Sequence, residues 1–330
     1  MSRLIVKRRE PSPINRKIEA LSRRIKRNHP KAPLIEKENR IRKAGDAGEK
    51  AADYHMRKLP DKNYYIFQGL RLLNDEEPFQ IDTLLFTPNF GMPVEVKNIA
   101  GILHFDKKHS QFTRTLNGNV ERFKNPILQV QRQRDELKQW VAKFDFLNIP
   151  LDYLFVNSNE KAIITADPHY DLVYRHSCNS DILLNKIIEL SNIYKKELLS
   201  PKEIRKLNRL LLKHHTPEDK DILQFFHLTP EDVMTGVQCP NCQSIPMKYQ
   251  HGIWICQTCL GKSADAHLKA IEDYFLLIKP SITNSELKAF LHMPTSHAAY
   301  RILSSLKLNF TGKYRNRTYH KNSSGIFTSF

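Results

Sequence analysis

Long apolar runs are missing from this chain of 330 residues: no stretch approaches the roughly 18–20 apolar residues of a membrane-spanning helix. The segment after Met1 is basic and interrupted, so it lacks the apolar core of a secretory signal. Glycine is scarce, at 11 residues, and no internal repeat is found, which excludes a collagen-like protein. Hydrophobic residues at 40% and charged residues at 26% are typical of a globular protein. We therefore expect a cytoplasmic protein with no membrane contact.

Acidic residues are outnumbered, because 35 Asp and Glu stand against 52 Lys and Arg, a net charge of +17. The excess lies at the two ends. Residues 1–43 carry 15 basic and 4 acidic residues, and residues 262–330 carry 10 and 4, whereas residues 44–261 are neutral overall. Cationic ends favour a polyanionic partner, so this distribution predicts binding of nucleic acid. The alternative is that the basic ends only aid solubility.

Composition and periodicity divide the chain into five predicted parts. Residues 1–43 predict a basic N-terminal arm that contains one short amphipathic helix. Residues 44–170 alternate helix and strand patterns and predict a mixed α/β domain. Residues 171–237 are helical by pattern, residues 238–262 contain paired cysteines, and residues 263–330 predict a small helical tail.

Four of the five cysteines form two Cys-x-x-Cys pairs, Cys239 with Cys242 and Cys256 with Cys259. Two such pairs supply four thiolates in a tetrahedron around Zn²⁺, and the 13 residues between them suffice for one hairpin. This layout predicts a structural zinc ribbon. The alternatives are two disulfides or a redox pair, which an odd fifth cysteine, Cys178, and the lack of an export signal disfavour.

Charged residues interrupt two predicted strands of the α/β part. Asp82 precedes an apolar run, and Glu95 and Lys97 stand two residues apart, hence on one face of their strand. Carboxylates on adjacent strands can hold a divalent cation such as Mg²⁺. A neighbouring lysine can orient or deprotonate the attacking water and offset charge on a phosphate. The alternative is a solvated ion pair on an exposed strand.

Four motifs in this region occur in a characteristic order: Gly45-x-x-Gly48-Glu49, Gln80-Ile81-Asp82, Glu95-Val96-Lys97-Asn98 and Asn125-Pro126-x-x-Gln129. This succession resembles the NERD (nuclease-related domain) family, a branch of the PD-(D/E)xK nuclease superfamily. The resemblance extends over about residues 40–165. It implies an α/β fold with a mixed central sheet flanked by helices.

The resemblance also implies roles for individual residues. Asp82 and Glu95 would be ligands of Mg²⁺ or Mn²⁺, and Lys97 would be the catalytic lysine. Glu49 would be a supporting acidic residue, and Gln129 would help to place water or phosphate.

Two features depart from the family pattern, and one agrees with it. Pro93 lies inside the predicted strand that carries Glu95, where proline is tolerated only at the start of a strand or on an edge. A tryptophan that often follows the Glu-x-Lys strand is absent, and Phe105 and Phe112 are the nearest aromatic residues. Members of the family with zinc ribbons similar to those of bacterial topoisomerases exist, which agrees with residues 239–259.

The tail resembles a winged helix-turn-helix. Two predicted helices are followed by a basic and aromatic segment, residues 312–319, that is typical of a wing. The second helix would enter the major groove of DNA, with Arg301 and Lys307 on or near it. The alternative is a small helical cap that packs on the zinc ribbon.

These observations together predict a metal-dependent nuclease that hydrolyses phosphodiester bonds, with DNA favoured over RNA as the substrate. Mg²⁺ or Mn²⁺ would serve catalysis, and Zn²⁺ would be structural. The alternative is a non-catalytic nucleic-acid-binding or regulatory protein that is built on a nuclease-like scaffold.

Overall fold

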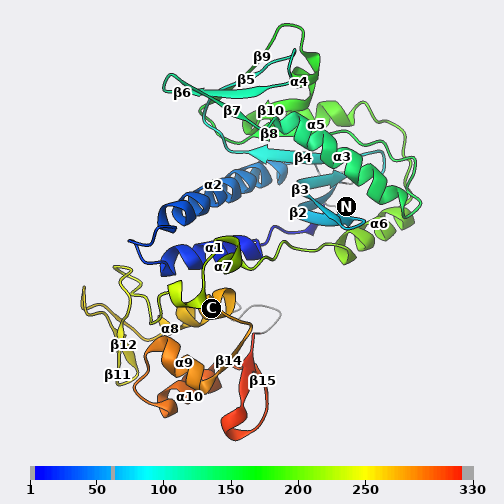
Figure 1. Ribbon diagram of the computed structural model, residues 1–330. Helices are drawn as coiled ribbons and strands as arrows, with labels where there is room; N and C mark the ends of the chain where they lie inside the picture. The colour runs from blue at the N-terminus through cyan, green and yellow to red at the C-terminus, as the bar shows by residue number, and fades with distance from the viewer. Residues whose placement is uncertain (1–3, 61–63, 322–330) are drawn as a thin grey trace. The chain divides into compact units, whose positions relative to one another are not determined.

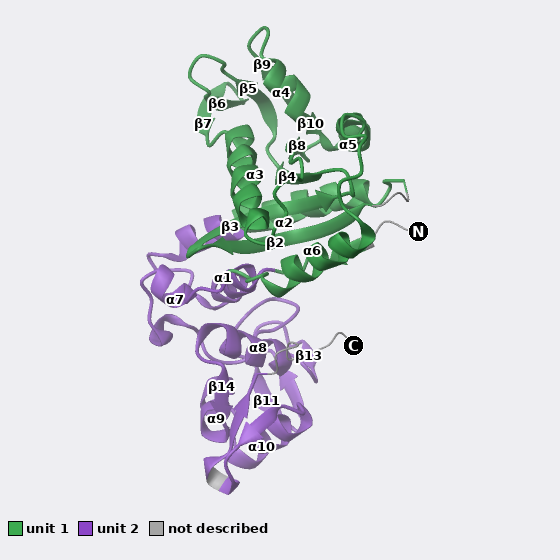
Figure 2. Ribbon diagram, turned by 90° about the vertical axis from the view of Figure 1, so that its right-hand side faces the viewer, with its two compact units in different colours: residues 1–11, 41–218 green, residues 12–40, 219–330 purple. Residues whose placement is uncertain are grey.

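The computed structural model describes residues 4–60 and 64–321, and the chain forms two compact units (Figure 1). Unit 1 consists of residues 1–11 and 41–218, and unit 2 of residues 12–40 and 219–330, coloured green and purple in Figure 2. This division differs from the five predicted parts, because the N-terminal segment contributes to both units. Among the described residues, no helix has both the length and the apolar character needed to cross a membrane.

Unit 1 is built on a mixed six-stranded sheet. In spatial order its strands are β1 (Leu4–Lys7), β2 (Tyr65–Asn74), β3 (Glu77–Phe86), β4 (Gly91–Lys97), β8 (Leu154–Asn157) and β10 (Ser177–Asn179). The strands β2, β3 and β4 form an antiparallel meander. In contrast, β1 pairs in parallel with β2, and β8 pairs in parallel with both β4 and β10.

Helices cover both faces of this sheet. The second half of α2 (Ala32–Met56) packs with α5 (Leu183–Ser191) on one face. On the other face, α3 (Pro126–Ala142) packs with α6 (Pro201–Lys213). The predicted α/β class with a mixed central sheet flanked by helices is therefore confirmed. The predicted helical part, residues 171–237, is not a separate module, since α5 and α6 belong to unit 1.

A second, four-stranded sheet follows β4. Its strands, in spatial order, are β7 (Asn119–Phe123), β6 (Phe112–Leu116), β5 (Gly101–Phe105) and β9 (Ala162–Ala166). Asn117 and Gly118 both have positive φ angles, 51° and 78°, so they form the tight turn of the hairpin between β6 and β7. Phe105 and Phe112 are buried beneath this sheet, where they contact Phe155 of β8. The remaining short elements of unit 1 are α4 (Asp171–His176) and η1 (Ser180–Ile182).

Pro93 is accommodated near the start of β4. It is opposite Leu84 of β3, and pairing with β8 begins only at the next residue, Val94. The missing amide hydrogen of Pro93 therefore costs no bond to β8. Proline at this position is compatible with a central strand that carries Glu95.

The predicted N-terminal arm is not separate from the folded units. Residues Leu4–Lys7 form β1, and α1 (Pro13–Arg24) buries Ile14, Ile18 and Leu21 in unit 2. These side chains pack against α7 (Ile222–Phe225) and α8 (His267–Leu277). The apolar spacing indicated the helix correctly, but sequence alone did not show which surface it covers.

Arg24 of α1 is completely buried and forms an ion pair with buried Asp273 of α8, with Nε 2.8 Å from Oδ2. Its Nη1 donates to the carbonyl oxygens of Met234 and Gly236. The guanidinium also lies 4.9 Å from the ring centre of Phe290. Arg24 therefore connects three segments of unit 2 that are far apart in sequence.

Replacing Arg24 by methionine should destabilise unit 2 by about 3–5 kcal/mol, because Asp273 would remain as a buried charge with too few partners. Urea unfolding monitored by circular dichroism measures this loss. Arg27→Met is the matched control, since Arg27 is exposed on the same segment and should change stability by less than about 0.5 kcal/mol. Equal stability of the two variants would refute a structural role for the Arg24–Asp273 pair.

The paired cysteines lie in the turns that flank the strands of a small three-stranded sheet in unit 2. Its strands are β11 (Lys248–Gln250), β12 (Ile253–Ile255) and β13 (Lys262–Ser263), with β12 in the centre. A short 3-10 helix, η2 (Pro230–Asp232), precedes it. Strands β11 and β12 form the hairpin that the spacing of the cysteines predicted.

The remainder of unit 2 has the element order of a winged helix-turn-helix. After α8 come β14 (Ser281–Thr283), α9 (Asn284–Leu291), α10 (Ser296–Ser305), β15 (Asn309–Thr311), η3 (Tyr314–Asn316) and β16 (Thr318–His320). The strand order is β14-β16-β15, so the last two strands form the hairpin expected of a wing. Thr283 caps α9 in a capping box with Glu286, and Thr295 caps α10.

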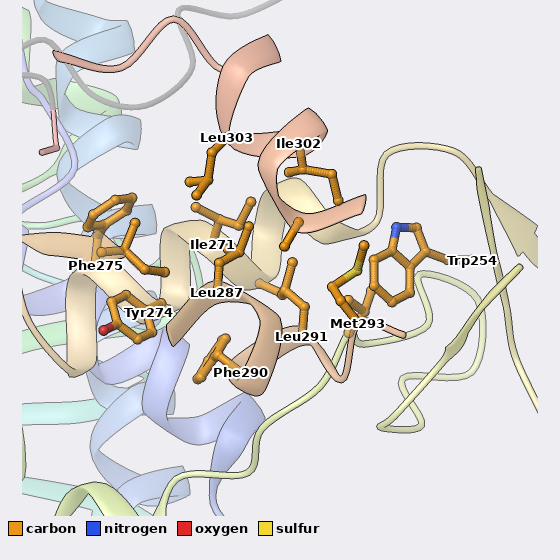
Figure 3. Packing of buried hydrophobic residues seen from close by; sticks show 14 of the residues in the cluster. Trp254, Ile271, Tyr274, Phe275, Leu287, Phe290, Leu291, Met293, Ile302 and Leu303 are labelled. Carbon is orange, nitrogen blue, oxygen red and sulfur yellow. The ribbon is translucent and has the colours of Figure 1, made fainter. Parts of the chain in front are cut away.

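The ribbon and the winged helix share one hydrophobic core. Trp254 of β12 is buried with Ile271 of α8, Leu287 of α9 and Leu303 of α10. Figure 3 shows Trp254 beside Met293, next to the helices. The tail therefore packs directly on the ribbon, and its element order is that of a winged helix.

Candidate active site

The strands β3 and β4 stop pairing where the charged residues begin. The last backbone pair joins Thr83 with Val94. Beyond it, Oδ2 of Asp82 accepts a hydrogen bond of 2.9 Å from the amide of Val96, so a carboxylate replaces the strand partner. Val94 and Val96 face the core shared with α2 and α5. Glu95 therefore points to the opposite face of β4, because side chains alternate along a strand.

Glu95 is buried, with 1% of its surface exposed, and each of its oxygens has a partner. Oε1 pairs with the ammonium of Lys97, and Oε2 accepts a 2.7 Å hydrogen bond from Nε2 of Gln133 on α3. The structure thus brings Asp82, Glu95 and Lys97 together at one end of the β3–β4 ladder.

Glu49 reaches the same place from α2. A Cβ atom on Gly48 would lie 2.6 Å from Oγ of Ser158 and 2.7 Å from Cβ of Asn98, so glycine allows α2 to approach the end of β4. Gly45 has open space around it, and the helix begins at Ala32 rather than at Gly45. Of the two glycines in the motif, Gly48 therefore has the clear packing role.

Several carboxylates lie close together in this site, and their burial and mutual repulsion shift their pKa values. Burial raises the pKa of Asp82 well above its usual range, and the nearby charges of Glu95 and Glu49 raise it further. Burial likewise raises the pKa of Glu49, although Arg9 opposes the shift. Burial would lower the pKa of the Lys97 ammonium, but the charge and hydrogen bond of Glu95 outweigh it, and the pKa is raised. The site therefore favours an additional cation near its carboxylates.

Gln129 and Gln133 occupy different places relative to Glu95. Gln129 lies half-buried in the first turn of α3, whereas Gln133, one turn later on the same face, donates to Glu95. The Oε1 atom of Gln133 is buried without a hydrogen-bond partner in the protein. The sequence analysis missed Gln133, and its i+4 spacing from Gln129 was the available signal.

Arg9 is the second residue that sequence reasoning missed. Its guanidinium forms ion pairs with Glu49 and Asp53 of α2. Its Nη2 also donates to the carbonyl oxygen of Asp82 at 2.9 Å. No local pattern indicated this contact, because 40 or more residues separate Arg9 from each of these partners.

The donor set at this site fits a hard divalent cation. Asp82 and Glu95 are buried carboxylates, Glu49 is a partly buried third one, and Oε1 of Gln133 is a buried acceptor without a hydrogen-bond partner in the protein. Oxygen ligands of this kind are those preferred by Mg²⁺ and Mn²⁺.

The four cysteines form a separate metal centre. Among the described residues, theirs is the group of His, Cys, Asp or Glu in which all ligand atoms lie within 4.8 Å of one another. The sulfurs of Cys239 and Cys259 are 3.6 Å apart, and those of Cys242 and Cys256 are 3.5 Å apart. Four thiolates bound to one Zn²⁺ at about 2.3 Å would be separated by similar distances. The cluster can therefore hold a metal such as zinc, with all four positions closed by protein.

Cys178 lies apart from that cluster, buried in β10. Burial raises the pKa of its thiol to about 12. The thiolate is therefore scarce at neutral pH, as expected for a cysteine with a packing role.

Replacing Asp82 by asparagine in EDTA should stabilise the protein at pH 7 by about 1–2 kcal/mol, because one of several crowded buried charges is removed while an acceptor for Val96 remains. An acid whose pKa is raised by folding binds more protons in the native state, so its destabilising effect appears as pH rises. The advantage of Asp82→Asn should therefore shrink as pH falls toward 4. Urea unfolding at several pH values measures it, with exposed Asp135→Asn as the control. A less stable Asp82→Asn at pH 7 would contradict this account.

Comparison with known proteins identifies the domain that carries this site. Residues 44–158 match the family model of NERD, the nuclease-related domain. Among solved structures, the chain is similar to the small subunit of the heterodimeric restriction endonuclease R.BspD6I, with 13% sequence identity and a TM-score of 0.20. That match covers 57% of this chain and 98% of the subunit. No curated protein matches the chain. Residues 44–158 are therefore a nuclease-related domain of the NERD family.

Proposed function

We propose that the protein is a nuclease that hydrolyses phosphodiester bonds of nucleic acid, with DNA as the substrate and Mg²⁺ or Mn²⁺ as the catalytic ion. One observation carries this proposal: Asp82, Glu95 and Lys97 meet at the end of the β3–β4 ladder, where buried carboxylates outnumber the cations. The match of residues 44–158 to a nuclease-related domain supports it. The alternative, a solvated ion pair on an exposed strand, does not fit, because the carboxylates of Asp82 and Glu95 are buried.

Each residue then has a stated part in the reaction. Asp82 and Glu95 would hold the divalent ion, with Glu49 as an additional carboxylate. When bound, such an ion polarises the phosphate and lowers the pKa of a water molecule. Lys97, held by Glu95, can donate hydrogen bonds from its ammonium to a phosphate oxygen. Gln133 fixes Glu95 through Nε2 and leaves Oε1 as an acceptor, and Gln129, one turn earlier on α3, would help to place water or phosphate.

The winged helix is the proposed DNA-binding site. Residues 281–321 contain seven Lys and Arg but one acidic residue, Glu286. On α10 the exposed side chains include Tyr300 and Arg301, and Tyr314 at the wing is 91% exposed. A helix with a polar exposed face and a basic hairpin beside it fit a groove and the adjoining phosphates.

The N-terminal cations are less available for this task. Arg9, Arg16, Lys17 and Arg24 are each in ion pairs with acidic residues of their own unit. Deleting residues 1–43 would therefore remove parts of the folded units as well as charge, so it would not report on DNA binding alone.

A cytoplasmic location is part of the proposal. Four cysteines that gather as free thiols suit a reducing compartment, where thiolates remain available to bind zinc. The zinc would be structural, since no ligand position is left for a substrate.

Incubation with linear, circular and single-stranded DNA and with RNA tests the proposal directly. We expect the wild type to cleave DNA in Mg²⁺ or Mn²⁺ and to be inactive in EDTA. A protein that cleaves none of these substrates but binds DNA tightly would instead be the non-catalytic alternative, in which the nuclease fold is a scaffold.

A further inference from the structure

The segment that precedes α1 enters the candidate active site as part of the main sheet. Strand β1 pairs with β2, and two hydrogen bonds to Gln68 of β2 hold the end of β1 and the residues just after it. Nζ of Lys7 donates to the carbonyl oxygen of Gln68 at 2.9 Å, and the amide of Arg9 donates to its Oε1 at 3.0 Å. The neighbouring residue, Gly69, has a positive φ of 62°, a backbone conformation that favours glycine, and it lies next to the guanidinium of Arg9.

The guanidinium of Arg9 is almost fully engaged. Nε lies 2.7 Å and Nη2 lies 3.1 Å from the two oxygens of Asp53, which is a bidentate pair. Nη1 pairs with Glu49. Nη2 also donates to the carbonyl oxygen of Asp82 at 2.9 Å and to Oγ1 of Thr83 at 3.2 Å. A lysine has one terminal nitrogen and cannot reproduce this set of contacts.

These contacts join two elements of the site. Glu49 and Asp53 are one turn apart on α2, and Asp82 and Thr83 are adjacent on β3. Arg9 therefore fixes the helix that carries Glu49 against the strand that carries Asp82. The bidentate bond to Asp53 sets the orientation of the guanidinium, and its remaining donors fix the positions of Glu49 and of strand β3.

We propose that Arg9 is a positioning residue of the active site, which holds Glu49 near the Asp82–Glu95 pair so that the charge of Glu49 supports a divalent ion bound by that pair. This inference rests on the proposed function. It assigns Arg9 no contact with substrate, and it gives the segment before α1 a part in the nuclease domain, outside residues 44–158.

The experiment compares Arg9→Lys with Arg8→Lys. Both variants keep the charge, but Arg8 is exposed and has its side chain outside the site, whereas Arg9→Lys loses the bidentate contact. Two quantities are measured: the dissociation constant of Mn²⁺ in the absence of nucleic acid, by titration calorimetry, and the dependence of cleavage on metal concentration. We expect Arg9→Lys to weaken Mn²⁺ binding and to raise the half-saturating metal concentration, each about tenfold. The rate at saturating metal should fall less than threefold, and Arg8→Lys should match the wild type.

Asp53→Asn provides a second test at the other end of the contact. It leaves Arg9 in place, and it should shift Mn²⁺ affinity in the same direction as Arg9→Lys. Thermal unfolding confirms that each variant is folded, and if Arg9→Lys does not fold, Asp53→Asn decides the question.

The outcomes separate this inference from the proposed function. If the wild type cleaves DNA and both folded variants keep its metal dependence, the role of Arg9 is refuted while the nuclease proposal stands. If the wild type cleaves nothing but binds Mn²⁺, the nuclease proposal fails, and the Mn²⁺ affinities of the variants still decide the role of Arg9. A wild type that binds no Mn²⁺ overturns the role of Arg9.

Discussion

Lys97→Ala should reduce cleavage of DNA by about 10³-fold, because the site loses the one ammonium that is paired with Glu95 and positioned to stabilise charge on a phosphate. The measurement is the rate of cleavage of a linear duplex at saturating Mg²⁺. Binding of the duplex should change little, since the winged helix that we propose to bind DNA belongs to the other unit. The expected signature is therefore a protein that binds DNA normally and cleaves it very slowly.

Lys124→Ala is the matched control for this experiment. Lys124 is an exposed lysine of the same unit, between β7 and α3, and its loss should leave the rate unchanged. Lys97→Ala leaves Glu95 with Gln133 as its remaining partner, so thermal unfolding must show that the variant is folded. A folded Lys97→Ala that cleaves as fast as the wild type would show that the assigned active site is wrong, even if the protein is a nuclease.

Loss of zinc should unfold the ribbon and the winged helix together. Structural zinc sites contribute about 10–16 kcal/mol of apparent binding energy, and here the ribbon supplies Trp254 and Met247 to the core of α8, α9 and α10. In Cys256→Ser/Cys259→Ser we expect zinc to fall from about one per chain to none. Hydrogen exchange should then become fast in residues 237–321, and binding of duplex DNA should be lost.

Unit 1 provides the internal reference for that prediction. The exchange rates of its main sheet should remain slow, since its cores contain no residue of the ribbon. Cys178→Ala should keep its zinc, because Cys178 lies in β10 rather than in the cluster. Zinc that persists in the double cysteine variant would refute the site, and a winged helix that stays folded without zinc would refute the shared core.

Some of the site was predictable because its residues are close in sequence. Glu95 and Lys97 share a strand face through the two-residue repeat of β structure. The four cysteines are brought together by two tight turns and one hairpin. The start of α3 also depends on neighbouring residues, because Asn125 accepts hydrogen bonds from the amides of Ile127 and Leu128 and Pro126 occupies the first helical position.

Counting charges along the sequence was a less reliable guide to which basic residues are free to bind nucleic acid. The basic clusters before residue 43 predicted an arm for nucleic acid, but Arg9, Arg24 and Lys17 are paired with Glu49, Asp273 and Asp219. Their partners lie 40 to 249 residues away, and a count of charges along a segment contains no information about such distances. The basic tail, in contrast, retains exposed cations such as Arg301, Lys307 and Lys313, and few acidic residues are near them in sequence.

Local spacing alone determined the α/β pattern, the pair Glu95 and Lys97, the cysteine ribbon and the helices of the tail, since each depends on residues within one or two elements. Only the tertiary structure decided that β1 completes the main sheet, that Gln133 holds Glu95, and that Arg9 joins Glu49 to the strand of Asp82. Those contacts depend on which distant surfaces pack together. Burial of apolar side chains decides that packing. The apolar periodicity of a segment shows which of its faces is buried, but not which distant surface covers that face.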